Sequence, residues 1–219
     1  MVVVRLSLVV RLQGHVSAVI GVGSTSSASS LIVVFDVETD GGSPKQRCIE
    51  MGFVVLESVS FQEVHSFSKY WRLPPGRRIN PYSQEKHGIT LDTLSRFGVD
   101  PYEGLCEFLD WVDRAKASGV DARVVAHNAA FDAKTVQNML EVCNIPRAFT
   151  KDECFCTMRA STPHAGLLDK KGKRKPPGNE ELYRLFHGSP PKWARLHSAL
   201  DDARVTAMNY RTGRERGWW

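Results

Sequence analysis

The stretch "FDVETDGG", residues 35–42, places two carboxylates one residue apart at the end of an apolar run. That run, residues 31–35, has the composition of a buried strand. Burying a charge is costly unless another group pairs with it. A strand that ends in Asp36 and Glu38 therefore predicts that something is held there to balance their charge.

The chain has 219 residues, enough for one α/β domain with a full hydrophobic core. Its net charge of +5 fits a polyanionic partner without requiring one. No apolar run reaches the length of a membrane span. The five cysteines are odd in number, which indicates reduced thiols and an intracellular location: cytoplasmic, nuclear or organellar. Cys154 and Cys156 lack the second ligand pair of a zinc-finger site.

The composition changes along the chain and divides it into segments. Residues 1–30 contain no acidic residue and end in a Gly/Ser-rich stretch, which is typical of a flexible leader or a targeting segment. An organellar location follows if this segment is a transit peptide. Residues 31–212 form the predicted main domain, and residues 213–219 are a short C-terminal tail.

Apolar periodicity predicts an α/β fold for the main domain. The first strands are expected at residues 31–37, 47–57 and 61–72. Their short links favour an antiparallel meander of three strands. Helices and a strand then alternate at residues 101–116, 123–126, 129–142, 179–186 and 199–210. This order predicts a mixed sheet with helices on both faces.

Two further acidic stretches follow where a strand gives way to a helix. They read "AHNAAFD" at residues 126–132 and "HSALDDAR" at residues 197–204. In an α/β sheet such strand ends converge on one crevice. Taken singly, each has an ordinary explanation: a helix N-terminal acid for Asp132, for example, and a structural histidine for His127. Their order and setting instead predict one cluster of carboxylates.

Carboxylates clustered in one crevice repel each other, and their pKa values rise unless cations neutralise them. Ligation by oxygen alone favours Mg²⁺ or Mn²⁺ over zinc. Two such ions suit in-line displacement at phosphorus, one beside the attacking water and one beside the leaving oxygen. A histidine side chain can take the proton from that water. The sequence provides His197 five residues before Asp202.

Taken together, these motifs resemble those of the DEDDh 3′–5′ exonucleases, the DnaQ-like or RNase T-like family. The matching stretches are "FDVETDGG", "HNAAFD" and "HSALDDARVTA". Connecting signatures also match: "HGIT" at residues 87–90, "CTM" at 156–158 and "ELYRLFHG" at 181–188. The resemblance covers about residues 31–212, which would make this segment an exonuclease domain.

The resemblance implies a ribonuclease H-like fold and a set of site residues. The metal-binding acids that it implies are Asp36, Glu38, Asp132 and Asp202. His197 would be the general base, and a tyrosine in its place would mark the sister DEDDy group. The H-x4-D spacing selects Asp202 over Asp201, which we expect to face away on its helix.

The resemblance also implies contacts to the substrate. The backbone of Thr39 and Asp40 would approach the terminal 3′-hydroxyl, although many relatives have Thr-Gly there, so Asp40 is a departure. Ile89 is interpreted either as a wedge against the terminal bases or as a core residue. His87 and Asn128, which lie in the matching stretches, complete the substrate-binding candidates.

Basic residues outside these motifs are candidates for phosphate contacts. Residues 169–177, "DKKGKRKPP", hold five basic residues with a glycine and two prolines, which predicts an exposed loop. The loop is interpreted either as a phosphate-contacting flap or as a solvated loop without a target. Arg77 and Arg78 are further candidates.

The expected function is metal-dependent 3′–5′ exonuclease activity that releases nucleoside 5′-monophosphates from a 3′ end of DNA or RNA. Base stacking and backbone contacts would make it tolerant of sequence. Two alternatives stay open: a catalytically silent nucleic-acid-binding or scaffold domain of the same fold, and a ribonuclease H-type endonuclease. The sequence leaves open a homodimer or a polymerase partner, and predicts no membrane partner.

Overall fold

The computed structural model describes residues 30–41, 45–119 and 123–219. All of the predicted leader except Ser30 lies outside the described residues. The described strands are β1 (Leu31–Thr39), β2 (Cys48–Glu57), β3 (Glu63–Tyr70), β4 (Arg123–Ala126) and β5 (Phe155–Cys156). The described α-helices are α1 (Pro81–His87), α2 (Leu91–Phe97), α3 (Pro101–Ala117), α4 (Ala129–Val142), α5 (Thr157–Ser161), α6 (Asn179–His187) and α7 (Ala199–Glu215).

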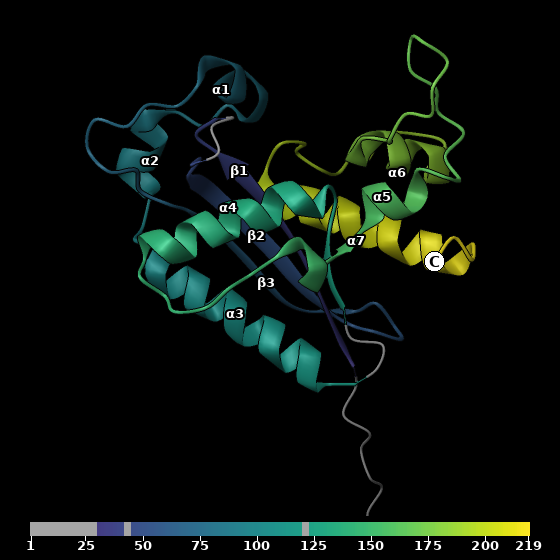
Figure 1. Ribbon diagram of the computed structural model, residues 1–219, viewed down its shortest axis with the longest axis horizontal. Coiled ribbons are helices and arrows are strands. Elements are labelled where there is room, and N and C mark those ends of the chain that lie inside the picture. Colours follow the sequence, from purple (N-terminus) through teal and green to yellow (C-terminus); the bar gives the residue numbers. More distant parts are fainter. Residues whose placement is uncertain (1–29, 42–44, 120–122) are drawn as a thin grey trace, which may run out of the picture.

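Within the described chain the strands form one sheet in the order β3-β2-β1-β4-β5. The first three strands pair antiparallel and make the predicted meander. β4 then pairs with β1 in parallel, and β5 pairs with β4 in parallel. The prediction of a mixed sheet is therefore confirmed, and β1 lies inside it with a neighbour on either side (Figure 1).

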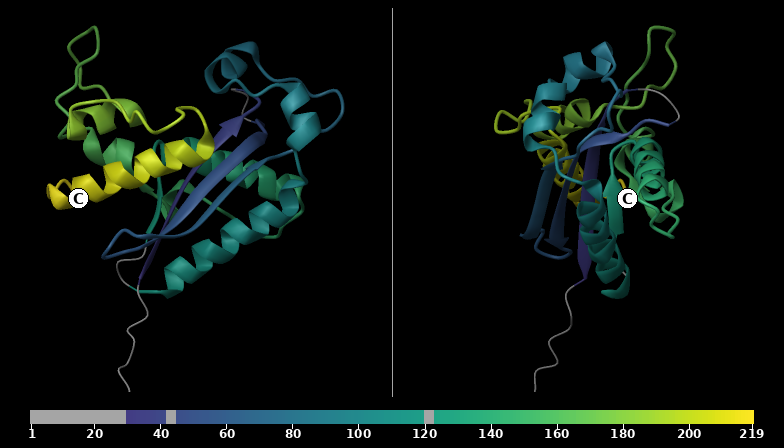
Figure 2. Two further views of the ribbon diagram at one scale, coloured as in Figure 1. Left: turned by 180° about the vertical axis from the view of Figure 1, so that it is seen from behind. Right: turned by 90° about the vertical axis from the view of Figure 1, so that its left-hand side faces the viewer.

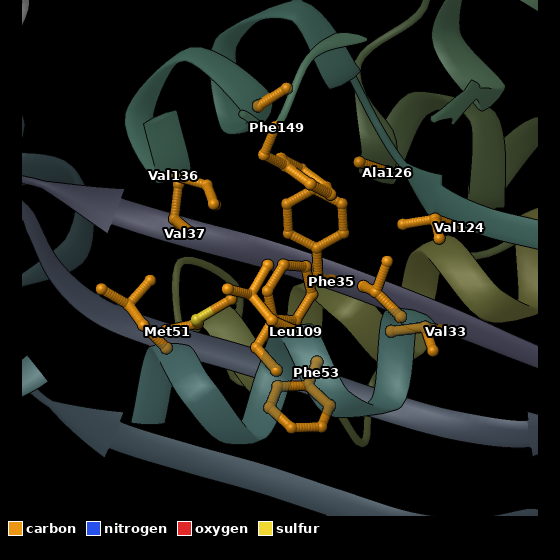
Figure 3. Close-up of a cluster of buried hydrophobic side chains, with 14 of the residues drawn as sticks. Val33, Phe35, Val37, Met51, Phe53, Leu109, Val124, Ala126, Val136 and Phe149 are labelled. Carbon is orange, nitrogen blue, oxygen red and sulfur yellow. The ribbon is translucent and has the colours of Figure 1, made fainter. Parts of the chain in front are cut away.

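Helices cover both faces of the sheet, with α3 and α4 on one face and α7 on the other (Figures 1 and 2). Val33, Phe35 and Val37 of β1 belong to the core under α3 and α4, which Figure 3 shows around Phe35. The alternate residues Ile32 and Val34 pack in a second core with α7. The two-residue period of β1 thus assigns each side chain to one of two helical layers.

The short helices α1 and α2 have no periodic signal in the sequence, and local capping defines them instead. The Asn80 side chain accepts a hydrogen bond from the Tyr82 amide at the start of α1. Thr90 and Thr93 form a reciprocal capping pair at the start of α2. A small core lies beside them, with Ile49, Ile79, Ile89 and Leu94 as its buried members, of which Leu94 belongs to α2.

The last helix, α7, continues to Glu215 rather than ending at residue 210 as periodicity suggests. Beyond it the chain turns back, and the Trp219 indole donates a hydrogen bond to the Tyr210 carbonyl at 3.1 Å. The indole ring lies directly on Gly213, where an added Cβ would clash with it. The boundary predicted at residue 212 therefore falls inside α7, and the residues after it pack against the domain.

The basic loop includes a hairpin that projects between α5 and α6 (Figure 1). We call residues 167–175 the basic hairpin. Leu168 bridges to Arg174 in antiparallel fashion. The Asp169 carboxylate accepts hydrogen bonds from the amides of Lys171 and Lys173, at 2.8 and 2.9 Å. These bonds give the tip a defined turn, because an aspartate side chain can close a turn on its own backbone.

Candidate active site

Asp36 and Glu38 lie at the end of β1 and line a cavity of about 380 Å³. They continue the alternation of Ile32 and Val34, so they lie on the α7 side of the sheet. The strand register shifts directly after Glu38. Such bulges commonly re-aim side chains next to active sites. The sequence pair that ends the first strand therefore opens onto a hollow rather than onto the core.

Asp132 enters the same cavity from the first turn of α4. It is 2% exposed, and the Val37 amide donates a hydrogen bond to its carboxylate. Its Oδ2 atom is buried and has no hydrogen-bond partner among the described residues. A buried carboxylate oxygen without a partner is costly. The atom therefore fits a bound cation as its missing partner.

α7 and the loop before it provide Asp202 and His197. The His197 amide donates a hydrogen bond to Asp202 Oδ2 at 2.8 Å. One potential ligand atom from each of Glu38, His197 and Asp202 lies within 4.8 Å of the others. His197 has a φ of 64°, a left-handed conformation that residues other than glycine rarely adopt. Residues held in this way cluster at functional sites.

Asp201 has different surroundings from its neighbour. Its Oδ2 atom accepts a hydrogen bond from the Arg195 amide at 2.9 Å, and its Oδ1 atom lies 3.7 Å from the Arg204 guanidinium. Asp202 lines the cavity, whereas Asp201 is not among the lining residues. Asp202 therefore faces the cavity and Asp201 faces away from it, which is the arrangement expected from the H-x4-D spacing.

The clustered carboxylates have strongly perturbed pKa values. Burial raises the pKa of Asp36 well above its usual range, and the negative charges around it raise it further. Burial, with the charges of Asp202 and Glu50, raises the pKa of Glu38 to about 8. Burial also raises the pKa values of Asp132 and Asp202. In the absence of metal the cavity therefore retains protons that a divalent cation would displace.

A fifth acid, Glu50 on β2, lies beside this group and belongs to no motif that the sequence reveals. It is 3% exposed and pairs with Glu38 across the β1–β2 ladder. Burial is the main reason that its pKa is raised. A charged residue inside an apolar strand is unusual, so the sequence alone could single out Glu50 as a residue of interest. Only the strand register shows that it lies next to the acids of β1.

His127 lines the cavity, and hydrogen bonds to neighbouring loops fix its ring. Its Nδ1 atom lies 2.9 Å from the Thr157 hydroxyl, and its Nε2 atom lies 3.0 Å from the Pro177 carbonyl. Burial lowers the pKa of His127 to about 4, so the ring is neutral at neutral pH. Both ring nitrogens have partners, which fits the structural role considered for this residue.

Thr39, Asp40 and His87 hold the turn that follows β1. The Asp40 carboxylate accepts a hydrogen bond from the Arg47 amide at 2.8 Å and forms an ion pair with Arg77. The His87 Nε2 atom lies 3.2 Å from the Thr39 carbonyl, and burial lowers the pKa of this ring. All three residues are buried, so the contacts that they make set the backbone beside the cavity.

The structure favours the core interpretation of Ile89 over the wedge interpretation. Ile89 is 4% exposed and packs with Ile79 and Leu94. The side chain is therefore enclosed by apolar neighbours, as expected of a core residue. Asn128 is exposed and has a left-handed backbone conformation, with a φ of 67°. It lines a second cavity of about 420 Å³ and is not among the residues that line the cavity of the acids.

Residues 33–210 match the model of the exonuclease family RNase_T. This match covers most of the chain, so the protein belongs to that family. Its fold and motifs are those of the DnaQ-like 3′–5′ exonucleases, and the resemblance noted in the sequence is confirmed. Exonucleases of this family use divalent metals.

Curated relatives match over part of their length. The 3′-5′ DNA exonuclease Cap18 of Escherichia coli is 29% identical over 103 residues, which cover 47% of this chain and 52% of that protein. A ribonuclease T of Haemophilus influenzae strain Rd is 29% identical over 121 residues, which cover 52% of this chain and 53% of that protein. The matched region thus spans about half the length of these relatives.

Solved structures share the fold at low sequence identity. The nuclease domain of 3′hExo, a DEDDh family member bound to rAMP, has a TM-score of 0.66 at 17% identity, covering 86% of this chain and 94% of that one. Escherichia coli Exonuclease I in complex with dT13 has a TM-score of 0.65 at 15% identity, covering 85% and 41%. A zinc-bound form of that enzyme with single-stranded DNA has a TM-score of 0.64 at 13% identity, covering 86% and 41%. These likenesses establish the ribonuclease H-like fold.

Proposed function

We propose that this protein is a 3′–5′ exonuclease that hydrolyses the terminal phosphodiester of single-stranded DNA or RNA and releases nucleoside 5′-monophosphates. The observation that carries the proposal is the meeting of four acids and a histidine around one cavity in a chain of an exonuclease family. These residues are Asp36, Glu38, Asp132, His197 and Asp202. They come from β1, α4, α7 and the loop before α7, so the fold brings them together.

The acids of the cavity suit hard divalent cations. The partnerless Oδ2 atom of Asp132 and the raised pKa of Asp36 both point to a cation as the missing counter-charge. Carboxylate oxygens favour Mg²⁺ or Mn²⁺, and the proposal places two such ions among the four acids. When bound, these cations would activate the attacking water and stabilise the charge on the leaving 3′-oxygen.

His197 is the proposed general base. Its side chain is exposed at the wall of the cavity, and its backbone is fixed by the hydrogen bond to Asp202. An imidazole in this place can accept the proton of the attacking water and release it to solvent. Asp202 thus has two proposed roles, because it would hold a cation and it sets the position of the base.

Other groups at the cavity suit a nucleic-acid strand. Phe131 lines the cavity and is 40% exposed, so its ring offers a face on which a base can stack. The basic hairpin leads through Pro177 to α6, whose first residues also line the cavity. Arg77 is engaged by Asp40 and by the Lys45 carbonyl, which leaves Arg78 as the more exposed phosphate candidate of the two.

The two rival functions make different demands on these residues. A silent nucleic-acid-binding or scaffold domain would not need four acids and a histidine around one cavity. A ribonuclease H-type endonuclease would share the acids, but it would also cut a circular strand, which has no 3′ end. The presence of His197 beside Asp202 favours the exonuclease.

The proposal also covers the location and the partners of the protein. None of the helices in the described part of the chain is long and apolar enough to cross a membrane. We retain the predictions of an intracellular location and of a nucleic-acid 3′ end as partner. A homodimer or a polymerase partner stays open.

The deciding experiment uses 5′-labelled single-stranded DNA and RNA of one sequence, with Mg²⁺, Mn²⁺ or EDTA. We expect a metal-dependent ladder that shortens from the 3′ end and no cleavage of a circular strand. Asp36→Asn should abolish the ladder, and His197→Ala should slow it by roughly 10²–10⁴-fold, the usual contribution of a general base. Retained binding without shortening in any metal would instead identify a scaffold.

A further inference from the structure

The N-terminus of α7 rests on two residues of β2. Glu50 and Gly52 are two positions apart and therefore lie on the same face of the strand. The Glu50 Oε2 atom lies 3.3 Å from the Ala199 amide, and the Oε1 atom lies 3.4 Å from the Ser198 hydroxyl. Gly52 has the backbone of Leu200 against it, and an added Cβ would clash there.

Glu50 supplies a cap that α7 does not supply for itself. Ser198 precedes the helix, but its side chain makes no capping bond to the helix amides. Its hydroxyl instead donates to Glu50, and the same carboxylate accepts the first amide of the helix. A negative charge at a helix N-terminus is favoured by the helix dipole. These contacts compensate for the burial of Glu50.

The strand register connects this support to the proposed site. Gly52 pairs with Asp36 across the β1–β2 ladder, and Glu50 pairs with Glu38. The residues of β2 that hold α7 are therefore directly opposite the acids of β1. This arrangement fixes the separation between the β1 acids and the pair formed by His197 and Asp202.

The position of Glu50 does not suit a direct metal ligand. It does not line the cavity, and both of its carboxylate oxygens already have protein partners. We propose that Glu50 is a positioning residue, which holds the N-terminus of α7 so that His197 and Asp202 face the acids of β1. The proposal rests on the exonuclease function proposed above.

The test compares Glu50→Gln with Glu50→Ala in the full-length protein. Glutamine can accept the Ala199 amide and hydrogen-bond to Ser198, so it should keep kcat and the Mn²⁺ dissociation constant within about threefold of wild type. Alanine should lower kcat and weaken Mn²⁺ binding by about 10–100-fold each, the usual loss when a group that orients metal ligands is removed. KM for a single-stranded oligonucleotide should change little. Glu57→Gln on the same strand is the matched control and should change none of these values.

Three outcomes would overturn the proposal. If Glu50→Gln loses Mn²⁺ binding as fully as Glu50→Ala, Glu50 is a ligand. If Glu50→Ala lowers the melting temperature but leaves kcat and Mn²⁺ binding of the folded protein unchanged, its role is structural alone. If neither variant differs from wild type, the contacts of Glu50 with the N-terminus of α7 are not needed for activity or metal binding. Mn²⁺ titration decides among these outcomes even if wild type cleaves nothing, in which case the exonuclease proposal fails separately.

Discussion

At the scale of single residues, two adjacent aspartates on α7 differ because their side chains leave the helix in different directions. Asp202 lines the cavity with His197, whereas Asp201 closes a turn by accepting the Arg195 amide. The two residues are of the same type and adjacent, and in the sequence only the spacing from His197 distinguishes them. The contacts around each of them predict separate effects on catalysis and on stability.

We expect Asp202→Ala to abolish cleavage and Asp201→Ala to keep it within about threefold of wild type. Asp201→Ala should instead lower the free energy of unfolding by about 1 kcal/mol, because one hydrogen bond to the backbone is lost. Initial rates on a labelled oligonucleotide and urea unfolding measure the two effects. A variant at Asp201 as inactive as the one at Asp202 would contradict this assignment.

At the scale of elements, the basic hairpin holds lysines with and without an ion-pair partner. Lys175 forms an ion pair with Glu181, which ties the base of the hairpin to α6. Within the described chain, no ion pair is found for the lysines nearer the tip, Lys170, Lys171 and Lys173. Their charges remain available to phosphates, which favours the flap interpretation over that of a loop without a target.

We expect replacement of these three lysines by alanine to raise KM for single strands and to leave kcat nearly unchanged. The salt dependence of binding should weaken by about 0.7 in the slope of log K against log salt for each lost phosphate contact. A control variant removes three positive charges elsewhere: Lys69→Ala, Arg96→Ala and Arg114→Ala. Equal effects of the two variants would show that net charge, rather than the hairpin, determines binding.

The apolar pattern of the sequence predicts many elements of this fold, and local capping explains two helices that it omits. The bounds of β4 and α4 agree with the predicted ones because apolar spacing defines both. The helices α1 and α2 are too short for a periodic pattern, and their caps depend on single side chains. The acids of the candidate site are predicted from their motifs. Glu50 is not, because its place depends on the pairing of β2 with β1.

At the scale of the whole molecule, the carboxylate cluster couples stability to pH and to metal. The pKa of Glu38 is about 8 in the folded protein, against an ordinary value of 4.5. Between these values the folded state retains a proton that the unfolded state has lost. Stability therefore falls as pH rises through this range. His127, with a pKa of about 4, acts in the opposite direction, but only below its ordinary value of 6.5.

We expect the melting temperature in EDTA to fall by several degrees between pH 6.5 and pH 8. Over most of that window the folded protein still holds the Glu38 proton that the unfolded chain has lost. The opposing contribution of His127 is small there, because the window begins at its ordinary value of 6.5. Added Mn²⁺ should raise the melting temperature more at pH 8 than at pH 6.5, because cations then bind ionised carboxylates. Calorimetry of wild type and Glu38→Gln checks this, since the variant should show a smaller fall. A melting temperature in EDTA that does not change with pH would contradict the coupling.

The docking of α7 on β1 and β2 has a consequence for biosynthesis. Asp36 and Glu38 leave the ribosome early, whereas His197 and Asp202 follow only after the strands and helices between them. Contacts between such distant segments form late, because closing a long loop costs entropy. The meander can therefore pair with α3 and α4 while the nascent chain still lacks His197 and Asp202 of the proposed site. If the proposed function holds, such an enzyme is latent during its own synthesis and gains activity when its last helix docks.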